Sequence, residues 1–232
     1  MSPVKSHYVS PSALSEFRKC PKCFYIDRNE KLKRPRGAFP TLPGGIDRIL
    51  KSYFDVHRAD GTLPPEIRDA LPDGTKLYAD TEKLKAMRNA RYPLLKMTIG
   101  NVTLAGGLDE LLVRADGAVS PFDYKTKGNV ITEDKDPFEY YRMQLNDYGL
   151  MLKTQGFTIT GKGYLGYWSP SEARNGKQET LVFMRCQVFE MDMDLDAATD
   201  EVVAAGKLLD EHRLPESSPS CDWCAWIANR IG

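Results

Sequence analysis

The sequence has no net charge, because its 32 basic side chains balance 32 acidic ones. This balance excludes the strongly basic body of many polyanion-binding proteins, so a polyanion could bind only to a local patch. No apolar run approaches the roughly 18 residues that a membrane helix needs. The first eight residues lack the apolar stretch of a secretory signal. We therefore expect a cytoplasmic protein without a membrane partner.

Cysteine is also scarce, and the five cysteines are an odd number in a chain without an export signal. A disulfide framework is therefore not expected. Cys186 stands alone in an apolar stretch, which predicts a buried small side chain. The other four form two Cys-x-x-Cys pairs, Cys20 with Cys23 and Cys221 with Cys224.

Four thiolates are a complete ligand set for zinc or for an iron–sulfur cluster. We predict that the two pairs form one site joining the ends of the chain. Closing a loop of about 200 residues costs on the order of 5 kcal/mol, and a structural four-ligand metal site contributes about 10–16 kcal/mol. The alternative is two unrelated, exposed pairs.

The charges are segregated along the chain despite the neutral total. Residues 18–36 carry eight basic and two acidic side chains, and residues 190–216 carry nine acidic and two basic ones. One interpretation is a pair of solvated helix faces. The other is a phosphate-contacting region near the N-terminus, with Lys31, Lys33, Arg34 and Arg36 as the candidate contacts.

The 232 residues are enough for a single domain over 1–232 with its own core. Ser10-Pro11 predicts a helix start, Gly117 a hairpin turn, and Gly156 a helix end. The expected helices cover about 11–20, 46–54, 81–92, 137–154 and 196–212. The expected strands cover 102–105, 108–113, 119–125, 163–168 and 181–189. This order predicts an α/β fold with a single mixed β-sheet flanked by helices.

Asp123, Tyr124 and Lys125 end a predicted strand, where side chains two residues apart share a face. Asp109 lies in the partner strand of the hairpin, so both carboxylates and Lys125 are expected to share one space. Two carboxylates suit Mg²⁺ or Mn²⁺, and a neighbouring lysine can orient water or stabilise phosphoryl charge. The set suits phosphodiester hydrolysis; the alternative is a cross-strand salt bridge on an exposed face.

Two further helices carry candidate residues. Gln144 and Tyr148 are four residues apart and so lie on one helix face. Asp47 lies in the first turn of a helix, where a carboxylate complements the helix dipole, but it also flanks the apolar stripe. A half-buried acid usually needs a cation or metal as partner.

Four segments in order resemble the RecB-like branch of the PD-(D/E)XK nuclease superfamily. They are residues 9–25, the Gly-Gly-Leu-Asp-Glu-Leu-Leu stretch at 106–112, the Pro-Phe-Asp-Tyr-Lys-Thr-Lys stretch at 121–127, and the Tyr-Arg-Met-Gln-Leu-Asn-Asp-Tyr stretch at 141–148. The resemblance implies a restriction-endonuclease-like core and assigns the metal acids to Asp109 and Asp123, and the catalytic lysine to Lys125. It places the family's glutamine and tyrosine at Gln144 and Tyr148.

The sequence departs from this family at two places. Asp47 stands where the family usually has a metal-binding histidine, and it is an adequate hard ligand. Iron–sulfur members, which include AddB-type and CRISPR-adaptation nucleases, have one N-terminal and three C-terminal cysteines. Here Arg230 stands near the third C-terminal position, and Cys23 supplies the fourth thiolate. The resemblance favours a 4Fe–4S cluster, although the ligands also fit structural Zn²⁺.

The resemblance implies a metal-dependent DNA nuclease acting in repair, recombination or phage- and CRISPR-related DNA processing. DNA is the expected partner, with a helicase or another DNA-processing protein as a second one. A non-cleaving DNA-binding or assembly module with the same fold is the alternative. A small-molecule enzyme using the same acids is a third reading, which the resemblance disfavours.

Overall fold

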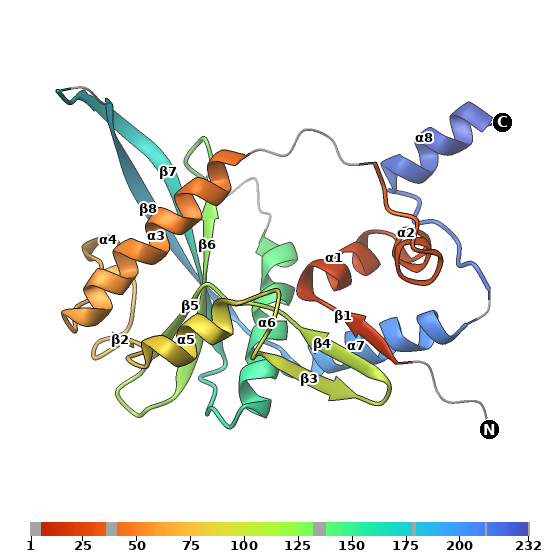
Figure 1. Cartoon of the computed structure of the whole chain (residues 1–232), viewed down its shortest axis with the longest axis horizontal. Coiled ribbons are helices and arrows are strands. Elements are labelled where there is room, and N and C mark those ends of the chain that lie inside the picture. Colours follow the sequence, from red (N-terminus) through yellow and green to blue (C-terminus); the bar gives the residue numbers. More distant parts are fainter. Residues whose placement is uncertain (1–5, 36–40, 132–137, 178–179, 212, 232) are drawn as a thin grey trace.

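A computed structural model describes residues 6–35, 41–131, 138–177, 180–211 and 213–231. The described chain is a mixed α/β structure in which helices flank two sheets (Figure 1). The predicted α/β class with flanking helices is therefore confirmed.

The larger sheet has the strand order β2-β5-β6-β7-β8. Its strands are β2 (Lys76–Leu77), β5 (Glu110–Val113), β6 (Val119–Thr126), β7 (Lys162–Asn175) and β8 (Thr180–Asp192). β5 and β6 form the predicted hairpin, and Gly117 has a φ of 83° in its turn, a conformation that glycine adopts without strain. The chain returns through α6 (Phe138–Thr154), so β7 pairs parallel with β6.

A second, three-stranded sheet corrects the prediction of a single sheet. It contains β1 (His7–Val9), β4 (Val102–Ala105) and β3 (Lys96–Ile99) in that order. The chain passes from one sheet to the other between β4 and β5, where the Leu108 amide donates to Met87 O at 3.2 Å instead of to a strand. A Cβ on Gly107 would lie 2.7 Å from the Arg88 carbonyl oxygen, so only glycine fits this close approach.

Local sequence signals mark the start of the first helix. The N-cap Ser10 accepts a hydrogen bond from the Ala13 amide, as the Ser-Pro signal predicts. The remaining helices are α1 (Pro11–Lys19), α2 (Pro21–Tyr25), the π-helix η1 (Ile26–Glu30), α3 (Thr41–Ala59), α4 (Pro65–Arg68), α5 (Thr81–Arg88), α7 (Leu195–Asp210) and α8 (Asp222–Ile231). Pro137 and His212, the predicted bounds of two helices, lie outside the described residues.

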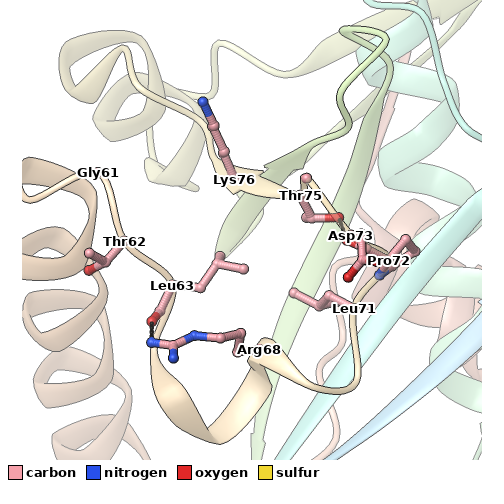
Figure 2. A pocket seen from close by; sticks show the side chains of 10 residues that line it. Gly61, Thr62, Leu63, Arg68, Leu71, Pro72, Asp73, Thr75 and Lys76 are labelled. Carbon is pink, nitrogen blue, oxygen red and sulfur yellow. Dashed lines mark hydrogen bonds between the residues drawn. The ribbon is translucent and has the colours of Figure 1, made fainter.

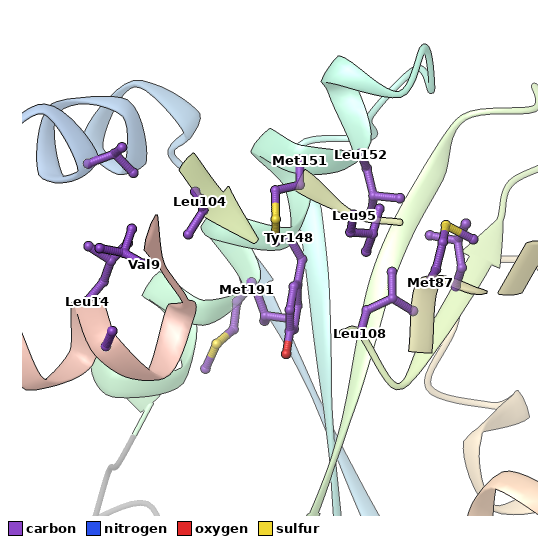
Figure 3. Close-up of a cluster of buried hydrophobic side chains, with 14 of the residues drawn as sticks. Val9, Leu14, Met87, Leu95, Leu104, Leu108, Tyr148, Met151, Leu152 and Met191 are labelled. Atoms are coloured by element: carbon purple, nitrogen blue, oxygen red, sulfur yellow. The ribbon is translucent and has the colours of Figure 1, made fainter. Parts of the chain in front are cut away.

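Two apolar cores hold the helices to the sheets. The larger one gathers residues from α1, α6, α7 and both sheets, including Leu14, Leu104 and Met151 (Figure 3). The smaller one lies under α3, where the Phe54 ring centroid is 4.8 Å from that of Tyr124. The two cores fix α3 and α6 against β6, the strand that carries the candidate acids.

The β7–β8 hairpin extends well beyond the rest of the molecule (Figure 1). Within the described part of the chain, no helix combines the length and the apolar character that crossing a membrane requires.

Candidate functional site

The strand β6 presents Asp123 and Lys125 to the same side. Lys125 Nζ forms an ion pair with Asp123 Oδ2, and it donates a hydrogen bond to Gln144 Oε1 at 3.2 Å. The alternate residues Phe122 and Tyr124 belong to the core under α3. Asp123 is almost fully buried, so this pair is not the exposed salt bridge that the sequence left as an alternative.

Asp109 lies just before β5 and is fixed by two neighbours. Its Oδ2 accepts a hydrogen bond from the Tyr124 amide at 3.0 Å, and its Oδ1 lies 2.8 Å from Lys51 Nζ. Lys51 also donates to Asp47 Oδ2 at 2.9 Å, across one turn of α3. One ammonium group therefore bridges Asp47 and Asp109.

The helix α6 supplies the remaining two predicted residues. Gln144 Nε2 donates to the Tyr148 hydroxyl at 2.6 Å, while its Oε1 receives the Lys125 ammonium. Tyr148 is buried with its ring among the apolar side chains of the larger core (Figure 3). This packing fixes Gln144, and Gln144 in turn fixes the direction of Lys125.

Burial and charge set the protonation of these groups. Burial raises the pKa of Asp123 to about 7, Lys125 acts in the opposite direction, and the Asp109 carboxylate adds to the increase. Burial acts to lower the pKa of Lys125, but the Asp123 carboxylate outweighs it and the pKa of Lys125 is raised. Lys51 behaves in the same way beside Asp109 and Asp47, so both lysines are held as ammonium ions.

A buried charge network behind the site supports the strand that carries Asp109. Glu110 is fully buried and accepts hydrogen bonds from Arg58 at 2.5 Å and Arg88 at 3.0 Å. Arg88 Nε also donates to the main-chain carbonyl of Asp109 at 2.8 Å, and the Tyr124 hydroxyl donates to Glu110 at 3.2 Å. The network ties α3 and α5 to both strands of the hairpin.

A cavity of about 350 Å³ opens beside the acids. Its lining includes Gly44 and Asp47 of α3 and Lys125 of β6. Gly44 has no atom within 4 Å of where a Cβ would be, so it leaves the cavity open. A separate cavity of about 260 Å³ lies in the loops between α3 and β2, where Arg68 reaches back to the Leu63 carbonyl (Figure 2). None of the candidate acids lines this second cavity.

The oxygen donors of Asp47, Asp109 and Asp123 fit a hard divalent cation. The Lys51 ammonium between two of these carboxylates marks a place where positive charge is held. The three carboxylates do not all lie within 4.8 Å of one another; among the described residues only the four cysteines form such a group. Lys51 and Lys125 stand beside the acids and offset their mutual repulsion.

The four cysteines form one site, as predicted. Cys20 Sγ lies 3.8 Å from Cys224 Sγ, and Cys23 Sγ lies 3.7 Å from Cys221 Sγ and 3.5 Å from Cys224 Sγ. The site joins α2 near the N-terminus to α8 at the C-terminus (Figure 1). Around one tetrahedral zinc ion with Zn–S bonds of about 2.3 Å, sulfur atoms stand about 3.8 Å apart. These residues therefore fit a structural metal.

One residue of the candidate site, Lys51, escaped the sequence analysis. Lys51 follows Asp47 by four residues, a spacing typical of helical ion pairs that could have revealed it.

The basic segment near the N-terminus makes contacts within the fold. Arg34, proposed as a phosphate contact, donates to Cys221 Sγ at 3.5 Å. Arg18, from the basic segment, pairs with Glu201 of the acidic one at 2.5 Å. Arg36 lies outside the described residues.

Comparison with known proteins gives a family match for this chain. No curated protein matches the chain. The crystal structure of SSO0001 aligns over 91% of this chain and 80% of that one, with 13% sequence identity and a TM-score of 0.37. The model of the PD-(D/E)XK nuclease superfamily matches residues 47–228, which include the acids, Lys125 and two of the four clustered cysteines, Cys221 and Cys224. The chain therefore belongs to the PD-(D/E)XK nuclease superfamily.

Proposed function

We propose that this protein is a metal-dependent DNA nuclease of the RecB-like type. The observation that carries the proposal is the continuous set of contacts from Asp123 through Lys125 to Gln144, with Asp109 held beside them. A charged lysine, fixed in direction next to two acids at an open cavity, is the arrangement that phosphodiester hydrolysis needs.

Each side chain has a role in this proposal. Asp109 and Asp123, aided by Asp47, would hold Mg²⁺ or Mn²⁺, which when bound stabilises the charge developing on a phosphoryl group. Lys125 would direct its protons at the attacking water or at a phosphate oxygen. Gln144 accepts from Lys125 and donates to Tyr148, so it prevents the ammonium from turning away from the cavity.

We also propose that the four-cysteine site holds one structural zinc ion. The sulfur separations of 3.5 to 3.8 Å support a single ion. In a 4Fe–4S cluster each thiolate binds a different iron, which requires a wider spacing. Metal analysis of the purified protein distinguishes zinc from an iron–sulfur cluster. Zinc would support the proposal, and iron with bound sulfide would instead support the 4Fe–4S cluster that the family resemblance favours.

Cleavage of labelled single- and double-stranded DNA with Mg²⁺ or Mn²⁺ tests the nuclease proposal. Lys125→Ala should lower the single-turnover rate about 100-fold or more, because removing one donor to the transition state typically costs this much. Lys127→Ala is the matched control, since Lys127 lies over the Tyr167 ring and not at the acids.

Two outcomes would contradict the proposal. Full activity in Lys125→Ala would move the catalytic role to another group. Binding of DNA by the wild type without cleavage would support a non-cleaving DNA-binding or assembly module. Repeating the assay with added proteins that are encoded next to this one in the genome would show whether a helicase or another DNA-processing partner is needed.

A further inference from the structure

A third cavity, of about 420 Å³, lies between α1, the segment after η1, and α8. Its lining residues include three basic ones, Arg28, Lys33 and Arg34, two acidic ones, Glu16 and Asp27, and the aromatic Trp223. The cavity is built from both ends of the chain, which the four-cysteine site brings together. None of the candidate catalytic residues lines it.

The basic side chains of this cavity are held in different ways. Arg28 Nε lies 3.1 Å from Asp27, and Arg34 Nε lies 3.8 Å from Glu16 while its Nη2 donates to Cys221 Sγ. Lys33 is exposed and, among the described residues, forms no ion pair or hydrogen bond. Each acid of the cavity therefore pairs with an arginine, and Lys33 adds a positive charge that no acid among the described residues pairs with.

Aromatic side chains continue from the cavity along α8, from Trp223 to Trp226. Trp223 is half-buried, and its ring meets that of Trp226 edge to face at 6.2 Å. Trp226 is 56% exposed, and the Arg230 guanidinium lies over its ring at 5.7 Å. Indole faces with guanidinium and ammonium groups beside them are the elements that proteins use to bind single strands of nucleic acid.

We propose that this cavity binds single-stranded nucleic acid, with one base stacked on Trp223 and a neighbouring phosphate on Lys33 and Arg34. A stacked base must leave its duplex, so the cavity distinguishes single strands from double strands. A space of about 420 Å³ is large enough to take one nucleotide. The proposal rests on the proposed nuclease function only in naming the bound strand as part of the substrate.

Fluorescein-labelled dT20 and a hairpin duplex of equal length serve as probes, without added divalent ion so that no cleavage occurs. Trp223→Ala should weaken dT20 binding about tenfold, because stacking one base contributes roughly 1–3 kcal/mol. Trp223→Phe should retain most of the affinity. Tyr92→Ala is the control, because Tyr92 is 77% exposed and lies outside the cavity.

The salt dependence tests the phosphate contact separately. Lys33→Ala should reduce the slope of log affinity against log salt by about 0.7, the value for one phosphate of a single strand. Because Trp223 lies between two cysteines, the metal content of each variant is measured. Equal metal content excludes loss of the cysteine site as the cause.

The outcomes separate this inference from the nuclease proposal. Unchanged dT20 affinity in Trp223→Ala, or equal losses in Trp223→Ala and Trp223→Phe with intact metal, would overturn the stacking site even if the wild type cleaves DNA. A Trp223-dependent affinity for dT20 in a protein that cleaves no DNA would overturn the nuclease proposal and leave the stacking site standing.

Discussion

Lys51 shows how a single side chain can shape the candidate metal site. Its ammonium bridges Asp47 and Asp109, two of the three carboxylates proposed to hold the divalent ion. An ammonium and a divalent cation cannot both occupy the space between these oxygens. An ion bound between these oxygens would displace Lys51, which would lower the apparent affinity for metal.

Lys51→Met removes this charge but keeps most of the apolar stem. We expect Mn²⁺ to bind about threefold to tenfold more tightly, on the order of 1 kcal/mol for a partly exposed pair. Titration of Mn²⁺ followed by electron paramagnetic resonance measures the affinity. Lys85→Met is the control, since Lys85 pairs with Glu82 on an exposed face of α5. An unchanged affinity would show that the ion and the ammonium occupy different places.

The sequence predicted the relative placement of Asp123 and Lys125 better than the placement of their neighbours. Asp123 and Lys125 share a face because strand side chains alternate, and this rule needs no knowledge of the rest of the fold. Their partners come from residues distant in sequence. The contact of Lys51 with Asp109, and the network joining Glu110 to Arg58 and Arg88, depend on how α3 and α5 pack on the hairpin.

At the scale of elements, α6 carries the candidate functional residue Tyr148 and, next to it, a buried acid that lowers the stability of the fold. Asp147 lies one residue before Tyr148, is fully buried, and has no hydrogen-bond partner for either carboxyl oxygen among the described residues. Burial raises its pKa well above the usual value; Glu201 adds to this and Arg18 opposes it. A buried carboxylate without hydrogen bonds destabilises the folded state.

This arrangement predicts how stability changes with pH. A carboxyl group with a raised folded pKa retains its proton when folded, so its penalty is absent below the unfolded pKa of about 3.9 and grows as pH rises towards the folded value. Asp147→Asn is neutral throughout and should be more stable at pH 8 by about 1–3 kcal/mol. The gain should be smaller at pH 5.

Urea unfolding at pH 5 and pH 8 measures the difference, with the exposed Asp60→Asn as the control. An Asp147→Asn variant that is less stable at both values would show that the carboxylate has a stabilising partner, with Arg18 as the candidate because it acts to lower the pKa of Asp147.

The elements that the sequence predicted well are those with local signals. Strand β4 matches its predicted bounds, and α1 begins at the predicted Ser-Pro cap. The apolar Ile49 in α3 is 69% exposed, because the buried side of the helix runs through Leu50 and Phe54 to the polar Arg58. Strand β1 was missed, since its three residues form a strand only by pairing with the distant β4.

At the scale of the whole molecule, the two segregated charge blocks meet. The basic start of the chain packs on the acidic α7, where Arg18 pairs with Glu201 and the Tyr25 hydroxyl donates to the Glu211 carbonyl at 2.9 Å. The buried His7 lies 2.8 Å from Asp210. These contacts hold α1 and α2 to α7 without the cysteines, whereas α8 is largely exposed and is joined to the fold through Cys221 and Cys224.

The last prediction follows from this difference between α7 and α8. Cys224→Ser should release the bound metal and free α8, while the two sheets and the core remain folded. A structural metal site of this kind contributes about 10–16 kcal/mol, against about 5 kcal/mol for closing the long loop between the cysteine pairs. Losing one metal ligand should therefore let the two cysteine pairs separate. Limited proteolysis should then cut near Trp226 before any cut in the core. Cys186→Ser is the matched control, because Cys186 lies in β8 apart from the group of four. Equal protection of α8 in both variants would show that the packing of α8, and not the metal, holds the end of the chain in place.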